Sequence, residues 1–336
     1  MRKSSIFFIS AIAFFTITTN AISSINVSAE APETVYVGGM PAGFTLKTGG
    51  AQVIGLSEVV SESGVCAPAS EAGIKTGDII CKVAGIPVES ITELNEIINK
   101  TKGKEIKIEA IRGVEKVEFI VRPVEEKQTG RYKIGVLVRE SVSGIGTVTY
   151  IDKETGRFGS LGHPVASGNT VEKQVLDGFV YECSIVGVHK GIRGKAGELR
   201  GMFLSDKCLG NAEKLCNCGI FGKISETFSV DELISVVATS NDVKPGSAYI
   251  YSTISGISPK RYEIEIVKVD KNNRENKNFV IKIIDNELIA ETGGIVQGMS
   301  GSPILQDGKL VGAVTHVFLN DPTRGYGIEI EKMLCE

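Results

Sequence analysis

The chain has 336 residues, of which 42% are hydrophobic and 23% are charged, a composition typical of folded globular proteins and not of disordered chains. This length is sufficient for two domains with separate cores. A formal net charge of −3 gives no electrostatic basis for binding nucleic acid, so we expect no nucleic-acid partner.

The N-terminal residues predict an export signal. Two basic residues precede an apolar run over residues 6–17, no further charge occurs before Glu30, and residues 27–29 offer a small-residue cleavage site. The apolar core is short for a membrane-spanning helix, whereas the uncharged stretch 4–29 is long enough. We expect residues 1–29 to carry the chain across a membrane as a signal sequence and transient anchor, and the sequence leaves open whether this segment is cleaved or kept.

Residues 30–126 predict a small α+β domain. Gly73 and Gly77 supply turns, a strand of alternating apolar residues begins at Asp78, and a helix-period stretch over 91–101 precedes a strand over 106–111. In this order the segments resemble a PDZ domain of the bacterial protease type.

The PDZ resemblance implies a groove that binds an extended peptide as an added strand, beside a glycine-containing loop that receives a terminal carboxylate. The sequence PAGFTLK at 41–47 matches that loop and strand, so we expect the peptide to contact Ala42, Gly43, Phe44 and Thr45. The expected ligand is the chain's own N-terminal region or the C-terminal tail of another protein. The alternative is a folded spacer whose groove is occluded.

A polar stretch over residues 125–130 has little to bury, and we place the domain boundary there, so that the second domain spans 127–336. Many short apolar runs separated by Gly and Pro predict that this domain is a β-rich barrel or sandwich. The predicted fold class of the whole chain is therefore mainly β.

Three histidines are candidates for a general base. His163 lies in the glycine-punctuated turn 158–164, where an exposed functional side chain tends to be held. His189 lies in a loop or at a strand edge and is expected to be a solvated surface residue. His316 ends an apolar strand, which favours a packed core or edge histidine.

Cysteine usage gives no metal site. Cys208, Cys216 and Cys218 cluster, and export would permit a local disulfide among them, but three thiols without a fourth ligand make a poor zinc site. We expect no metal and no cofactor.

A carboxylate at Asp285 follows the apolar run 279–284, a strand-end position from which it could orient a catalytic histidine. An aspartate at such a position is also an ordinary turn residue. On the residues alone, Asp152, Asp206 and Asp270 remain alternatives.

The string GMSGSPILQDGKLVGAVTH at 298–316 is typical of a protease nucleophile turn followed by a β-hairpin. Glycines on both sides of Ser300 allow the tight turn that exposes its hydroxyl. The N–H groups of Gly298 and Ser300 are expected to form an oxyanion hole. The segment resembles the corresponding turn of trypsin-like enzymes, which implies a trypsin-like barrel, whereas an ordinary Gly/Ser/Pro loop is the alternative.

Three segments carry a more specific resemblance, which extends over essentially the whole chain. They are GSLGHP at 159–164, GIFG at 219–222 and the block over 292–327. They are similar to the SpoIVB peptidase family, serine endopeptidases of endospore-forming bacteria with a membrane-targeting segment, a PDZ domain and a catalytic domain. The resemblance implies that His163 is the general base, Asp285 the orienting acid and Ser300 the nucleophile.

The resemblance also implies a biological role. A member of this family would be exported from the forespore into the space between forespore and mother cell and would cleave itself near its N-terminus. Its substrate would be a membrane-bound sporulation regulator, and cleavage would release an intramembrane protease that matures a late sigma factor.

Two other functions fit the same sequence. A non-catalytic PDZ adaptor would keep Ser300 only as a turn residue. An HtrA-like quality-control protease would cleave unfolded proteins broadly, although that group usually carries its PDZ domain after the protease domain.

Overall fold

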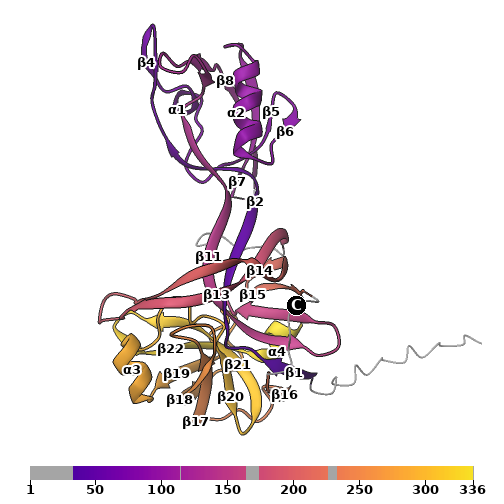
Figure 1. Ribbon diagram of the computed structural model, residues 1–336, viewed down its shortest axis with the longest axis vertical. Coiled ribbons are helices and arrows are strands. Elements are labelled where there is room, and N and C mark those ends of the chain that lie inside the picture. Colours follow the sequence, from indigo (N-terminus) through magenta and orange to yellow (C-terminus); the bar gives the residue numbers. More distant parts are fainter. Residues whose placement is uncertain (1–32, 114, 164–173, 226–232, 336) are drawn as a thin grey trace, which may run out of the picture. The chain divides into compact units, whose positions relative to one another are not determined.

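The structure, a computed structural model, describes residues 33–113, 115–163, 174–225 and 233–335 (Figure 1). The predicted signal sequence, residues 1–29, lies outside the described residues. Strands predominate, which confirms the predicted mainly β class. None of the helices in the described ranges is long and apolar enough to cross a membrane.

The predicted PDZ region folds around its own hydrophobic core. Helix α2 (Ile91–Lys100) confirms the predicted helix, and the side chain of its N-cap Ser90 accepts a hydrogen bond from the Glu93 amide at 3.2 Å. This helix buries Leu94 and Ile98 against the neighbouring strands. The other elements of the region are β3 (Val59–Ser61), β4 (Gly64–Cys66), α1 (Pro68–Glu71), β5 (Ile79–Val83), β6 (Ile86–Pro87), β7 (Ile106–Arg112), β8 (Glu115–Val121), β9 (Val124–Glu125) and β10 (Tyr132–Lys133).

An ion pair with a buried carboxylate fixes the turn that precedes β5. Arg112 Nε lies 2.7 Å from one carboxylate oxygen of Asp78, and the Lys75 amide donates to the other at 2.9 Å. Burial opposes ionisation of Asp78, but the hydrogen bonds from Arg112 and from the Lys75 amide outweigh it and hold the pKa of this carboxyl below its usual value. The charged carboxylate therefore stays in place at neutral pH and holds the turn.

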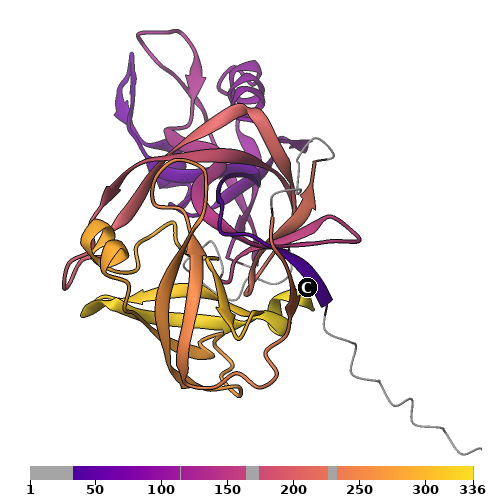
Figure 2. The ribbon, with the colours of Figure 1, turned by 60° about the horizontal axis from the view of Figure 1, so that its bottom comes forward.

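The second region contains the C-terminal strands and two short helices. Its elements are β1 (Glu33–Val37), β12 (Arg157–Leu161), β13 (Gln174–His189), β14 (Glu198–Cys216), β15 (Gly219–Ile224), β16 (Ser235–Ala238), β17 (Gly246–Ser252), β18 (Lys260–Val269), β19 (Phe279–Ile283), α3 (Asn286–Thr292), β20 (Pro303–Gln306), β21 (Lys309–Phe318), β22 (Asp321–Glu329) and α4 (Ile330–Leu334). Strands β17 to β22, coloured brown to yellow in Figure 2, surround one core that includes Ile264 and Phe279. Strands β12 to β15 help to enclose another, which includes Phe158 and Ile220.

Two long strands contribute to both regions. Strand β2 (Pro41–Leu56) pairs antiparallel with β11 (Val136–Asp152) along most of its length. The second half of β2 buries Val53 in the PDZ core, whereas its first half buries Phe44 and Leu46 with the residues of β12 and β15. Both strands therefore run from one region into the other without interruption.

The predicted PDZ domain spans residues 30–126, but in the structure its N-terminal part belongs with the second region. Strand β1 pairs with β11 and with β16, which belongs to the second region. The first half of β2 also lies in that region. Residues 33–47 therefore pack with the C-terminal strands, and the PDZ core begins at the second half of β2.

The predicted peptide-binding segment has both of its edges paired in the structure. Ala42, Gly43, Phe44 and Thr45 lie in the first half of β2, where β11 pairs with one edge and β13 with the other. A Cβ atom added at Gly43 would lie 2.6 Å from the ring of Phe203, so the strand is also covered closely on one face. With both edges paired, this segment has no free edge for an added peptide strand.

Candidate active site

The predicted hairpin after Ser300 is confirmed. Strands β20 and β21 pair antiparallel, and the two turn residues, Asp307 and Gly308, both have positive φ, of 51° and 77°. Positive φ at both central positions is typical of the tight turns whose twist matches that of paired strands. Ser300 therefore lies three residues before a rigid strand pair.

Glycines and a threonine fix the turn that carries Ser300. Gly298 and Gly301 have φ of 98° and 95°, the left-handed region that favours glycine. A Cβ atom at Gly301 would lie 2.1 Å from the carbonyl oxygen of Thr147 on β11. The Thr147 hydroxyl donates to the Gly298 carbonyl at 2.9 Å, and its amide donates to the Ser300 carbonyl at 3.0 Å. The turn is thus held against β11 from both ends.

The backbone N–H groups of this turn alternate between used and unused donors. Met299 donates to the Val296 carbonyl at 3.1 Å, and Gly301 donates to the Val314 carbonyl at 2.8 Å. Within the described residues, the N–H groups of Gly298 and Ser300 donate to no other group. The N–H groups of Gly298 and of Ser300 itself are therefore available as the two donors that an oxyanion hole needs.

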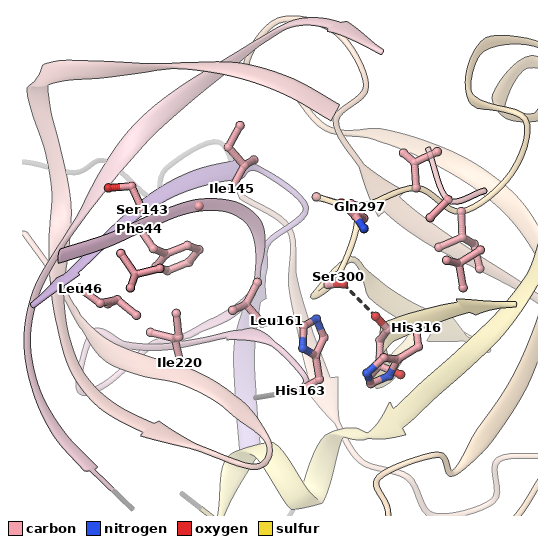
Figure 3. A pocket seen from close by; sticks show the side chains of 18 of the residues that line it. Phe44, Leu46, Ser143, Ile145, Leu161, His163, Ile220, Gln297, Ser300 and His316 are labelled. Carbon is pink, nitrogen blue, oxygen red and sulfur yellow. Dashed lines mark hydrogen bonds between the residues drawn. The ribbon is translucent and has the colours of Figure 1, made fainter. Parts of the chain in front are cut away.

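Ser300 and His163 line the same cavity, which has a volume of about 420 Å³ (Figure 3). His163 follows β12 through Leu161 and Gly162, both of which have positive φ, of 72° and 67°. The Ser300 hydroxyl donates to the Thr315 carbonyl at 2.8 Å. For His163 to accept this proton, the hydroxyl must rotate away from that carbonyl, a rearrangement common when substrate binds.

The ring of His316 contacts the ring of His163. The two ring centroids lie 4.8 Å apart, with the planes inclined at 41°, and His316 lines the same cavity. Desolvation, the neighbouring His163 and the charge of Lys277 lower the pKa of His316 to about 4. His316 lies within β21, two residues before its end, and is exposed, so the predicted packed or edge position did not anticipate this ring contact.

Protonation of His316 is expected to make stability depend on pH. The pKa of His316 is about 4 in the folded protein against an ordinary 6.5, so between these values the unfolded chain binds a proton that the folded chain does not. Stability should therefore fall as the pH falls through this range and level off below it. Urea unfolding of the unmodified protein and of His316→Gln checks this, because the variant should show a shallower slope; equal slopes would contradict the expectation.

Asp285, the predicted orienting acid, is the N-cap residue of helix α3 in the structure, and its catalytic role stays a prediction. Its carboxylate caps helix α3, where one oxygen accepts from the Leu288 amide at 2.9 Å and the other from the Glu263 amide at 3.3 Å. Asp285 is not among the residues that line the cavity of Ser300 and His163. Two of the three predicted triad residues, Ser300 and His163, thus line one cavity, and the ring of His316 contacts that of His163.

Replacing Asp285 separates the capping role from the catalytic one. Asp285→Ala is expected to lower the free energy of unfolding by about 1 kcal/mol through loss of the cap. Asp285→Asn should keep both the cap and most of kcat, because asparagine is an equally good N-cap. Urea unfolding and kcat of both variants check this. A folded Asp285→Asn protein whose kcat has fallen by about 10⁴-fold, as loss of a triad carboxylate would predict, would restore the original assignment.

Asp152 and Asp270, two of the other candidates, lie outside this cavity. One carboxylate oxygen of Asp152 accepts hydrogen bonds from the amides of Glu154 and Thr155, so this residue organises a turn. The main chain of Asp270 bonds to Asn278, and the side chain of Asp206 lies outside the described part. Neither Asp152 nor Asp270 lines the cavity. Among the described residues, no three His, Cys, Asp or Glu side chains are placed to hold a metal ion together.

Comparison with known proteins gives two family matches. Residues 130–334 match the family model described as SpoIVB peptidase S55, and residues 42–122 match that of the PDZ domain. A solved structure of Rv3671c from M. tuberculosis H37Rv, an inactive serine-to-alanine mutant, is 13% identical, covers 57% of this chain and 80% of that chain, and has a TM-score of 0.31. The peptidase match contains both His163 and Ser300.

Proposed function

The chain belongs to the SpoIVB peptidase S55 family and is a serine peptidase, and we propose that Ser300 is its nucleophile and His163 its general base. The observation that carries this assignment is that both side chains line one cavity, beside two backbone N–H groups that donate to no other described group. The family match gives the class of reaction, and the cavity indicates which residues perform it.

In the proposed reaction, His163 accepts the proton of the Ser300 hydroxyl as the oxygen attacks a peptide carbonyl carbon. The N–H groups of Gly298 and Ser300 then bind the oxyanion of the tetrahedral intermediate. His163 donates the proton to the leaving amine, and a water molecule hydrolyses the resulting acyl-enzyme by the same steps. His316, whose pKa is about 4, is neutral at neutral pH and so packs against His163 without adding a second positive charge.

We propose that the substrate is a membrane-held regulatory protein and that its cleavage triggers intramembrane proteolysis and activation of a late sigma factor during sporulation. Two observations support this role: the family membership and the basic, then apolar, N-terminal sequence that is typical of exported proteins. In this proposal the protein is exported from the forespore into the intermembrane space, transiently anchored by its N-terminal segment.

We also propose that the PDZ region binds a peptide, either the chain's own N-terminal region or the C-terminal tail of another protein. The PDZ family match supports a peptide-binding role. Because Ala42, Gly43, Phe44 and Thr45 are paired on both edges, the binding surface lies elsewhere in that region.

Self-processing tests the proposal on the full chain. The intact mass of the unmodified protein and of Ser300→Ala is measured after expression under identical conditions. Loss of an N-terminal segment only from the unmodified protein supports a serine peptidase that cleaves itself and maps one cleavage site. Identical masses, together with no cleavage of added peptides by the unmodified protein, would contradict the proposal and favour an adaptor.

A further inference from the structure

The cavity beside Ser300 is lined mainly by apolar residues in the described part of the chain. None of the described residues that line it is an aspartate, glutamate, lysine or arginine. Its described polar side chains are those of Ser143, His163, Gln297, Ser300, Thr315 and His316, and the Thr315 hydroxyl is buried without a hydrogen-bond partner among the described residues. A few fixed polar groups in an otherwise apolar cavity are typical of a site that orients a ligand's polar part and encloses its apolar part.

Four apolar side chains form one wall of this cavity. Phe44, Leu46, Leu161 and Ile220 lie together on one side of Ser300, and His316 lies on the other (Figure 3). All four are buried and belong to one hydrophobic cluster. They come from β12 and β15, which pair with each other, and from β2, which pairs with β11 and β13, so the wall is part of the strand core and not of a loop.

Leu161 occupies an unusual backbone conformation in this wall. Its φ of 72° lies in the left-handed region, which is uncommon for residues with a bulky side chain. A Cβ atom added at Gly146 would lie 2.1 Å from Leu161 Cδ2, so the leucine side chain crosses the space that the missing side chain of Gly146 leaves open. Strained residues of this kind cluster at functional sites, where the surrounding structure maintains them. Here the conformation places Leu161 between His163 and the rest of the wall (Figure 3).

We propose that this wall is the specificity pocket and that it binds an apolar side chain of the substrate residue whose carbonyl carbon Ser300 attacks. The inference rests on the proposed function and adds the substrate class. The Cα of that residue is bonded directly to the attacked carbon, so its side chain must lie in the cavity that holds the Ser300 hydroxyl. A charged side chain would lose its hydration there without gaining a described partner of opposite charge, and the wall therefore excludes it.

Cleavage-site mapping tests the inference on the full chain. A mixture of proteome-derived peptides is digested, the new termini are identified by mass spectrometry, and kcat/KM is measured for matched peptides with Leu, Phe, Lys or Glu before the scissile bond. We expect the apolar peptides to be preferred by about 10²-fold or more, because a pocket without a matching group leaves a charge unpaired. Leu161→Ala should lower kcat/KM for the Leu peptide about tenfold relative to the Phe peptide, because it removes wall surface and enlarges the pocket.

Leu215→Ala is the matched control. Leu215 belongs to the same buried cluster and has the same 7% exposure as Leu161, but it does not line the cavity. The Leu215→Ala replacement should destabilise the protein and leave the preference for the Leu peptide over the Phe peptide unchanged. Labelling of Ser300 by a fluorophosphonate, which does not require a particular side chain, reports separately that the nucleophile is active.

The outcomes distinguish a failure of the specificity inference from a failure of the proposed function. If Ser300 is labelled but peptides are cleaved after charged residues, the specificity inference alone is overturned. An unchanged Leu to Phe preference in a folded Leu161→Ala protein would have the same meaning. If the folded unmodified protein shows no labelling and no cleavage, the proposed function is overturned, and the inference with it.

Discussion

Replacing Ser300 with alanine is expected to reduce kcat for peptide hydrolysis by about 10⁴-fold to 10⁶-fold, because the nucleophile and its covalent intermediate are lost. The fold should be retained. Among the described residues the hydroxyl bonds only to the Thr315 carbonyl, and the turn is held instead by backbone groups and by Thr147. The measurement is the hydrolysis rate of a self-processing-site peptide by the two purified proteins, with unfolding curves to compare their stability.

Ser302→Ala is the control for this prediction. Ser302 is fully buried, and its hydroxyl donates to that of Ser252 at 3.0 Å in the protein interior. Its removal should lower the free energy of unfolding by about 1 kcal/mol and leave substantial hydrolysis. Activity that survives Ser300→Ala and disappears in a folded Ser302→Ala protein would overturn the assignment of the nucleophile.

Replacing His163 with alanine is expected to have a similarly large effect, a loss of about 10⁴-fold to 10⁶-fold in kcat. Without the imidazole, the serine hydroxyl keeps its proton and the leaving amine receives none. The double variant with Ser300→Ala should be no less active than either single variant, because residues that act as a unit are not additive. Steady-state kinetics of the three variants measure both effects.

Two other histidines provide the comparison. His189 ends β13, is exposed and does not line the cavity, so His189→Ala should leave kcat unchanged. His316→Ala removes the ring that packs on His163 and should reduce kcat less than His163→Ala does. The reverse order, with His316→Ala the more damaging change in a folded protein, would identify His316 as the base.

Local patterns in the sequence predicted the local elements well. The hairpin after Ser300 and helix α2 both follow from short-range signals: turn residues between apolar runs in the first case, and 3.6-residue periodicity in the second. The expected place of Ser300 before the hairpin follows from the same pattern. These elements depend mainly on residues close to one another in the chain.

The sequence is least informative where distant segments decide the outcome. Residues 41–47 look like a free PDZ strand because nothing nearby shows that β13, more than a hundred residues later, pairs with their second edge. The contact between His163 and His316 likewise depends on the fold, which brings β12 and β21 together. No periodicity or spacing in a single sequence encodes such a pairing.

Asp285 is a different case, because a local signal was present. An aspartate directly before a run of helix-forming residues is a common N-cap, and the residues after it do form α3. The family resemblance pointed to a catalytic role instead. The capping geometry therefore provides a physical alternative that the sequence already contained.

The strands shared by the two regions determine where the protein can be divided. The chain enters the PDZ core along β2 and returns along its antiparallel partner β11, so the PDZ core is an insertion within a β-hairpin of the peptidase. A protein that starts at residue 127 would lack β1 and the first half of β2, which lies between β11 and β13. Removing residues 48–140 and joining the two strands by a short turn would instead keep every strand of the peptidase in its place.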